Sequence, residues 1–122
     1  MTWHFENDRP IYLQIMDELM VKIISGEYVA GEKIPSVREL AAEIKVNPNT
    51  LQRAFSELEA LNIIKTQRTS GRYVTEDIEL LKELRDNAAQ QRAKHFFEEM
   101  KQLGFDETTA FEYLKKAGKD DK

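Results

Sequence analysis

The chain of 122 residues is long enough for one domain with an appendage, or for two small modules that share a core. Its hydrophobic fraction of 41% supports a packed core, and the absence of Cys excludes disulfide frameworks, thiolate nucleophiles and Cys-ligated zinc. The formal net charge of −4 argues against a polyanion partner, but residues 60–75 carry Lys65, Arg68 and Arg72 and no acid, which leaves a local basic patch. No stretch has the pattern of a signal peptide or a membrane span, which favours a soluble cytoplasmic protein.

A first helix is predicted over residues 10–25. Apolar side chains recur there at every fourth position, Pro10 suits the first turn, and Gly26 suits the end. A loop that contains two glycines and a proline follows this helix.

The next two predicted helices are short and are joined by a tight link. Ser36 and Glu39 form a capping box, in which each side chain bonds the backbone N–H of the other residue. After a link of about two or three residues, Asn47 caps a further helix, Pro48 suits its first turn, and the apolar stripe continues to about Leu61. Two short helices with so tight a joint must cross steeply to share a core, which predicts a helix-turn-helix.

The sequence "NIIKTQRTSGRYV" then changes to a β pattern. Ile63 and Ile64 begin one strand, "RTSG" has the residues of a turn, and Tyr73 returns in a second strand. Because a two-stranded hairpin is marginal alone, we expect it to lean on the three helices with its polar tip outward.

The helix after the tight link also carries polar side chains suited to DNA. If its apolar stripe faces the core, Asn49, Gln52 and Arg53 fall on or near the outer face. Asn and Gln can pair with adenine, Arg can pair with guanine, and Thr50 can meet a phosphate or a thymine methyl group. A helix amino terminus also favours phosphate. The alternatives are a capped surface helix with solvated polar residues and a hairpin whose basic tip is an ordinary solvated turn.

The ordered motifs between Pro10 and Val74 resemble the winged-helix DNA-binding domain of the GntR family of bacterial transcription regulators. They are "PIYLQI", "GEKIPSVRELA", "VNPNTLQRAF" and a wing that contains Gly. The resemblance implies a mainly α fold with a small β-hairpin wing, a winged helix-turn-helix. It also implies these DNA contacts: Arg38, Asn47, Asn49, Thr50, Gln52, Arg53, Arg68, Thr69, Ser70, Gly71 and Arg72. The chain departs from the family pattern at Asn62 and Thr69, where relatives usually have Gly. It also departs at Pro48, a position where relatives often have a basic residue.

The rest of the chain, residues 76–122, is predicted to be a helical tail distinct from the winged helix of residues 1–75. A long helix begins at a cap at Thr75 and ends at Gly104. Asp106 caps a last helix, which Gly118 ends before the charged stretch "KDDK". Two helices of this size are not expected to enclose a cavity of the usual ligand size.

This tail is predicted to be a two-helix dimerisation segment. One short helix cannot cover a partner of about 28 residues, and an uncovered apolar patch usually marks an interface. The expected dimer contacts are Ile78, Leu81, Leu84, Ala88, Phe96, Phe97, Met100, Leu103, Phe111 and Leu114. The alternative is that the tail folds back onto the winged helix. A short helical tail is similar to that of the YtrA subfamily, and this resemblance implies dimerisation and control of neighbouring ABC-transporter genes.

The sequence therefore predicts a DNA-binding transcription regulator, a repressor that binds an inverted-repeat operator in double-stranded DNA as a homodimer. No enzyme activity, cofactor or metal is expected, because no Gly-rich phosphate loop or nucleophile elbow is present. A metal at His95, which has acids at helical spacing, is a minor alternative to an ordinary surface histidine. The competing function is a helical protein-interaction module without DNA binding, and the sequence leaves any small-molecule effector open.

Overall fold

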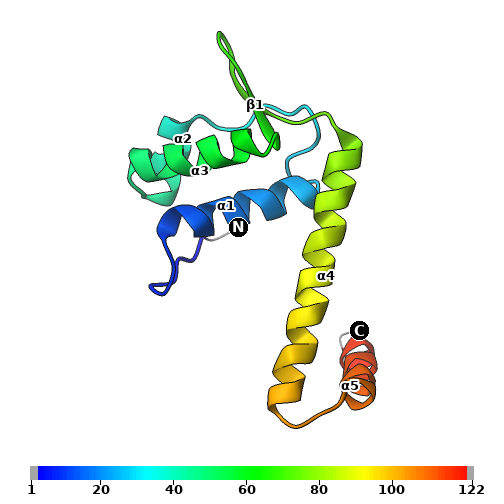
Figure 1. The fold of residues 1–122 in the computed structure, drawn as a ribbon. Coiled ribbons are helices and arrows are strands. Elements are labelled where there is room, and N and C mark those ends of the chain that lie inside the picture. The colour runs from blue at the N-terminus through cyan, green and yellow to red at the C-terminus, as the bar shows by residue number, and fades with distance from the viewer. Residues whose placement is uncertain (1–2, 121–122) are drawn as a thin grey trace. The chain divides into compact units, whose positions relative to one another are not determined.

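The computed structural model describes residues 3–120, and the chain divides into two compact units, Met1–Leu84 and Arg85–Lys122 (Figure 1). The helices are α1 (Ile11–Ile24), α2 (Val37–Ile44), α3 (Pro48–Ala60), α4 (Ile78–Gln102) and α5 (Glu107–Asp120), and the strands are β1 (Ile64–Gln67) and β2 (Gly71–Val74). The predicted fold class, mainly α with one small hairpin, is confirmed. The two ends of the chain, including the last part of the charged stretch "KDDK", lie outside the described residues.

The segment before α1 is fixed by a buried glutamine that the sequence did not single out. The Gln14 Oε1 atom accepts a hydrogen bond from the Glu6 backbone N–H at 2.6 Å. Its Nε2 atom donates to the carbonyl oxygens of Glu6 at 2.8 Å and Arg9 at 2.9 Å. A buried amide with all these partners satisfied holds the backbone ahead of it firmly. The first turn of α1 therefore starts from a defined position.

The predicted capping box and tight link are both present. The Ser36 hydroxyl accepts from the Glu39 N–H at 3.1 Å, and the Glu39 carboxylate accepts from the Ser36 N–H at 3.2 Å. Helix α2 ends at Ile44, and the C-cap residue Lys45 has a left-handed φ of 59°. The Asn47 side chain then caps α3 by accepting from the Asn49 N–H at 2.8 Å. Specific caps thus fix the start of α2, the end of α2 and the start of α3.

The core of the first unit is built from the inner faces of these helices and the base of the hairpin. On α3, four members of the predicted stripe are fully buried, and α3 packs against both α1 and α2. These four are Leu51, Ala54, Phe55 and Leu58. Leu61, predicted as the last member, is 52% exposed, because α3 ends at Ala60 before the stripe reaches it. Burial of this stripe leaves the opposite side of α3 exposed, which is where the polar residues lie.

The hairpin pairs β1 with β2 in an antiparallel register, from Ile64 opposite Val74 to Gln67 opposite Gly71. Its second edge is covered by the segment before α2. The Ile34 N–H donates to the Arg72 carbonyl at 3.0 Å, and the Val74 N–H donates to the Glu32 carbonyl at 2.9 Å. The hairpin therefore gains a third line of backbone pairing as well as helix contacts, which offsets the weakness of two strands alone.

Helix α4 starts later than predicted. Thr75 is buried, and its backbone N–H donates to the Ile63 carbonyl at 2.9 Å, so it continues the hairpin pairing. Its hydroxyl accepts from the Asp77 N–H at 3.1 Å, which is ahead of α4 and not within its first turn. The cap is supplied by Asp77, whose carboxylate accepts from the Leu80 N–H at 3.1 Å. Leu81 and Leu84 on the first turns then pack against the core of the first unit. The first compact unit ends at Leu84, so it includes the start of α4.

In the second unit, Asp106 caps α5 as predicted, because its carboxylate accepts from the Thr109 N–H at 2.9 Å. The predicted end at Gly118 is wrong, since α5 continues to Asp120. A single glycine costs a helix only about 1 kcal/mol, which is too little to stop it. On α5, Ala110 is buried, whereas Phe111 is 50% exposed. Within the described residues, no helix is both long and apolar enough to cross a membrane.

Candidate nucleic-acid interface

The outer side of α3 is a polar face that no other element covers. Asn49, Gln52 and Arg53 are all exposed there, as predicted, and Thr50 is half-buried at the margin. Ser56 is also exposed on this face, and its hydroxyl accepts a hydrogen bond from the Gln52 Nε2 atom at 3.2 Å. Asn47 lies exposed at the cap, ahead of this face. These short and amide-bearing groups can approach base edges or phosphates closely.

One border of this face is formed by a contact between α3 and α1. The Cζ atom of Arg53 lies 3.7 Å from the centroid of the Tyr12 ring. The Arg53 Nη2 atom also donates to the Tyr12 hydroxyl oxygen at 3.1 Å. A guanidinium stacked on an aromatic face gains a cation–π attraction without losing its charge. Sequence reasoning missed Tyr12, because its partner is far away along the chain.

The other border is formed by the base of the wing. The Arg72 Nε atom donates to a Glu59 carboxylate oxygen at 2.6 Å, and its Cζ atom lies 5.1 Å from the Phe55 ring centroid. Burial acts to raise the pKa of Glu59, but hydrogen bonds from Arg72 and Thr66 outweigh it and hold that pKa below its ordinary value. Arg72 therefore lies half-buried against α3, whereas Arg68 at the polar tip of the hairpin is exposed. Its contact with DNA stays a prediction.

The wing tip carries Arg68, Thr69 and Ser70, all exposed. The turn is closed by the Ser70 N–H, which donates to the Gln67 carbonyl at 3.1 Å. Gly71 has a φ of 123°, and a Cβ atom there would lie 3.0 Å from the side chain of Lys33. Thr69 is not among the described residues with positive φ, so this turn does not require the glycine that relatives usually have at that position.

Arg38 and Lys33 add positive charge near these elements. Arg38 is exposed on the first turn of α2, and no salt bridge to it is found within residues 3–120. Lys33 is exposed beside β2. The sequence analysis did not name Lys33, although a basic residue just before "IPSVREL" was visible in the sequence. The polar face of α3 is thus accompanied by cations from α2, the wing and the loop that pairs with it.

The left-handed position after α3 also agrees with the sequence analysis. Asn62 has a φ of 64°, a left-handed conformation that Asn tolerates and that suits the Gly of the family pattern equally well. The Ile63 N–H then donates to the Leu58 carbonyl at 3.0 Å and leads the chain into β1. This turn sets the direction in which the wing leaves α3.

The predicted dimer contacts fall into three groups in the structure. Two of them, Leu81 and Leu84, pack on the core of the first unit, as the fold-back alternative describes for those residues. The half-buried contacts are Ala88, Phe96, Phe97 and Met100. The exposed contacts are Ile78, Leu103, Phe111 and Leu114. The second unit therefore leaves large apolar side chains uncovered.

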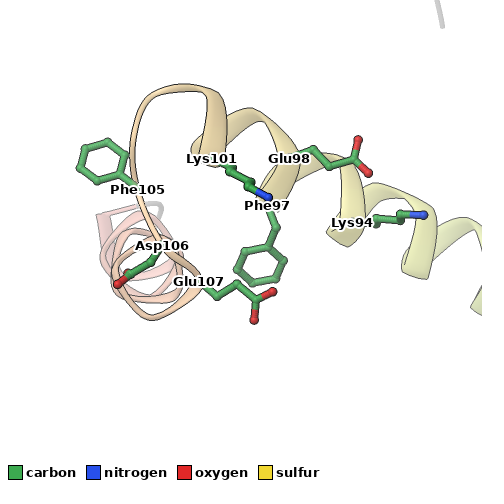
Figure 2. Close-up of a pocket in the computed structure, with 7 residues that line it drawn as sticks. All are labelled: Lys94, Phe97, Glu98, Lys101, Phe105, Asp106 and Glu107. Carbon is green, nitrogen blue, oxygen red and sulfur yellow. The ribbon is translucent and has the colours of Figure 1, made fainter.

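The second unit also contains a hollow, which the sequence analysis did not expect. It has a volume of about 490 Å³ and is formed between the end of α4 and the start of α5 (Figure 2). Its lining residues are Lys94, Phe97, Glu98, Lys101, Phe105, Asp106 and Glu107. The turn at Gly104 separates the two helices and creates this space. The hollow is open to solvent, and most of its lining residues are exposed, so the expectation that two helices enclose no cavity of ligand size stays a prediction.

His95 has the environment of a surface histidine. Its Nε2 atom lies 3.3 Å from a Glu99 carboxylate oxygen, and both side chains are exposed. Across the described residues 3–120, no group of three His, Cys, Asp or Glu side chains is placed to hold a metal ion.

The helix-turn-helix of α2 and α3, followed by the β1–β2 hairpin, is the winged-helix architecture of DNA-binding proteins. Residues 11–74 match the model of the bacterial regulatory proteins of the gntR family. The chain belongs to the GntR family, and it is a DNA-binding transcriptional regulator. The family and the relatives found are transcription regulators and not enzymes.

Several known proteins are similar to this chain. The uncharacterized HTH-type transcriptional regulator YhcF of Bacillus subtilis is 40% identical over 115 residues, which cover 94% of this chain and 95% of YhcF. The HTH-type transcriptional repressor YtrA of the same species is 46% identical over 68 residues, which cover 56% of this chain and 52% of YtrA. The chain thus spans only about half the length of YtrA, and the predicted likeness to YtrA-type regulators is confirmed.

Among solved structures, a GntR family transcriptional regulator from Listeria monocytogenes superposes with a TM-score of 0.86 at 42% identity, covering 92% of this chain and 98% of that one. DNA-binding domains of this type bind operator DNA in related structures. In one of them, the amino-terminal domain of AraR is in complex with mutant ORR3; it is 26% identical, with a TM-score of 0.54, and covers 57% of this chain and 100% of that one.

Proposed function

We propose that the protein is a transcriptional repressor that binds an inverted-repeat operator as a homodimer. The observation that carries this proposal is the polar face of α3, where exposed Asn49, Gln52 and Arg53 lie opposite a fully buried apolar stripe. A helix with this division can enter the major groove with its first turns while its other side remains in the core. Asn49 and Gln52 supply the amides that pair with base edges.

Phosphate contacts position this helix on the duplex in the proposal. Arg38 at the start of α2 and Arg68 at the wing tip are exposed and charged, and each can meet a backbone phosphate. The residues of the tip that accompany Arg68 are Thr69, Ser70 and Gly71. Because phosphate contacts carry no sequence information, loss of either arginine weakens binding to all duplexes alike.

The homodimer is proposed from the uncovered apolar surface of the second unit. Leu103 is 72% exposed and Phe111 is 50% exposed, although both are large apolar side chains. Such patches normally mark an interface, and a second copy of the same chain covers them symmetrically. A twofold dimer presents two α3 helices to half-sites about one helical turn apart.

Repression and the regulated genes are proposed from the resemblance to the YtrA subfamily alone. That resemblance points to the genes of a neighbouring ABC transporter, and to action in the cytoplasm, where the operator lies. A reporter fused to the transporter promoter tests this proposal. Deletion of the regulator should raise expression, and unchanged or lower expression would contradict a repressor at that promoter.

The main alternative is a protein-interaction module, and salt dependence separates the two. We expect duplex DNA to bind with an affinity that falls steeply with salt, since each phosphate contact adds about −0.9 to the slope of log affinity against log salt. Absence of binding to any duplex at low salt would contradict the proposal and favour the alternative.

Sequence discrimination is proposed to depend on Gln52. Gln52→Ala removes an amide that can read a base, so the ratio of affinities for cognate and scrambled duplexes should fall by about 5- to 150-fold. Gln91→Ala removes an exposed amide on α4, away from the proposed DNA contacts, and serves as a control that leaves the ratio unchanged. If the Gln52 variant discriminates as well as the natural protein, Gln52 does not read a base.

A further inference from the structure

We propose that Tyr12 is a positioning residue for DNA binding, which holds Arg53 in the orientation that meets a backbone phosphate. The inference rests on the proposed function and deepens it. It begins from two contacts made by one guanidinium: the stack on the Tyr12 ring at 3.7 Å and the hydrogen bond to its hydroxyl at 3.1 Å. Together these contacts fix both the plane and the direction of a side chain that is otherwise long and flexible.

The platform that holds Arg53 is itself rigid. Tyr12 is half-buried, packs against the hydrophobic core, and lies on the first turn of α1. The segment ahead of that turn is tied down by the three hydrogen bonds of the buried Gln14 side chain. Arg53 is therefore ordered before any ligand arrives, and binding does not have to order it.

The contacts of Arg53 leave its charge uncompensated. No carboxylate lies within salt-bridge distance of Arg53 in the part of the chain that the structure describes. Arg72, at the opposite border of the α3 face, is instead paired with Glu59 at 2.6 Å. An exposed guanidinium held by a neutral ring keeps donors for an anion, whereas one held by a carboxylate does not.

The position of Arg53 favours a phosphate over a base as its ligand. Because Arg53 contacts α1, it lies at the α1 border of the polar face, whereas Gln52, one residue earlier and about 100° around the helix, lies farther from that border. When a helix lies in a groove, groups at its border face the sugar–phosphate backbone. The ligand class is thus a phosphodiester of the operator, bound by the N–H groups that Tyr12 does not occupy.

The test is a double-mutant cycle in the full-length protein. The variants are Tyr12→Leu, Arg53→Ala and the double variant, measured on a selected operator duplex and a scrambled duplex over a series of salt concentrations. Arg53→Ala should weaken both duplexes by a similar factor and reduce the salt slope by about 0.9. Tyr12→Leu should weaken binding by about fivefold, and this factor should nearly vanish when Arg53 is already Ala.

Two further variants keep the result interpretable. Tyr12→Phe retains the ring and loses only the hydroxyl, so its affinity should lie between those of the natural protein and Tyr12→Leu, even if Tyr12→Leu lowers the melting temperature. Lys82→Ala removes one exposed positive charge on α4 and should leave the affinity unchanged.

Independent, additive losses from Tyr12→Leu and Arg53→Ala would overturn the inference, while binding of the natural protein would still support the proposed function. Loss of discrimination in Arg53→Ala with an unchanged salt slope would also overturn it, because Arg53 would then read a base. If the natural protein binds no duplex, the proposed function fails first.

Discussion

Two arginines border the polar face of α3, and the chemistry of their partners gives them different roles. Arg53 stacks on a neutral tyrosine and keeps its charge, whereas Arg72 is held by the Glu59 carboxylate. The ion pair between Arg72 on β2 and Glu59 on α3 holds the wing against α3. The wing tip then depends on Arg68 for its exposed charge.

This difference predicts that the two wing arginines respond differently to truncation. Arg68→Ala should reduce the slope of log affinity against log salt by about 0.9, with little change in stability. Arg72→Ala should change that slope less and lower the free energy of unfolding by about 1 kcal/mol, because Glu59 loses its partner. Duplex titrations and urea unfolding of both variants measure this. Equal slopes for the two variants would show that Arg72 meets phosphate despite Glu59.

The Arg72–Glu59 pair also predicts a pH dependence of stability. The pKa of Glu59 lies below its ordinary value of 4.5, so the pair contributes stability above that pH and loses it as the pH falls through the folded-state pKa. The natural protein should therefore be more stable than Glu59→Gln at neutral pH, and the difference should shrink below about pH 4.5.

Urea unfolding from pH 7 to pH 3 measures this difference, with Glu57→Gln as a control on the exposed side of the same helix. A difference between the natural protein and Glu59→Gln that is the same at pH 3 as at pH 7 would rule out the ion pair as its cause.

At the scale of elements, local signals were predicted well. The Ser36–Glu39 box, the Asn47 cap and the apolar stripe of α3 depend on residues within a few positions of one another, so the sequence alone contains the needed information. The polar face of α3 follows from the stripe, because a helix with one side buried must expose the other.

Features that depend on distant residues could not be predicted. Thr75 resembles a helix cap in sequence, but its backbone N–H pairs with Ile63 across the hairpin, and α4 begins only at Ile78, after the Asp77 cap. Tyr12 and Arg53 are 41 positions apart, and no local pattern indicates that they meet.

The end of the last helix is a local feature that was also predicted wrongly. Gly118 resembles a helix end in sequence, but a single glycine does not outweigh the helix propensity of its neighbours.

The tight link between α2 and α3 supplies a prediction about helix ends. Lys45 has a left-handed φ of 59°, which costs a non-glycine residue roughly 1–2 kcal/mol. Lys45→Gly should relieve this cost and raise the free energy of unfolding by about 1 kcal/mol, less the added entropy of the unfolded chain. The same type of change at Ala42, exposed inside α2, should lower it by about 1 kcal/mol. Thermal unfolding that shows both variants equally destabilised would contradict the strain at Lys45.

At the scale of the whole molecule, the two units differ in how well they cover their apolar residues. The first unit has a closed core that includes Leu81 and Leu84 from the start of α4. In the second unit Ala110 is buried, and Leu103, Phe111 and Leu114 are largely exposed. The contrast supports the proposal that the second unit completes its core with a second copy.

Phe111→Glu should therefore break the dimer without unfolding the first unit. The substitution places a charge in the proposed apolar interface, so the variant should sediment as a monomer at micromolar concentration. Its affinity for an inverted repeat should fall by at least about 100-fold, because the second half-site is no longer tethered. Gln91→Glu adds the same charge at an exposed polar site and should remain dimeric. A natural protein that sediments as a monomer would contradict the proposed assembly.

Selection of bound duplexes from a random pool tests the central proposal, paired reading of DNA by two α3 helices, most directly. We predict that the enriched duplexes contain an inverted repeat whose half-sites are centred about 10 base pairs, or one helical turn, apart. Enrichment of a single half-site without a repeat, or no enrichment at low salt, would contradict the proposal.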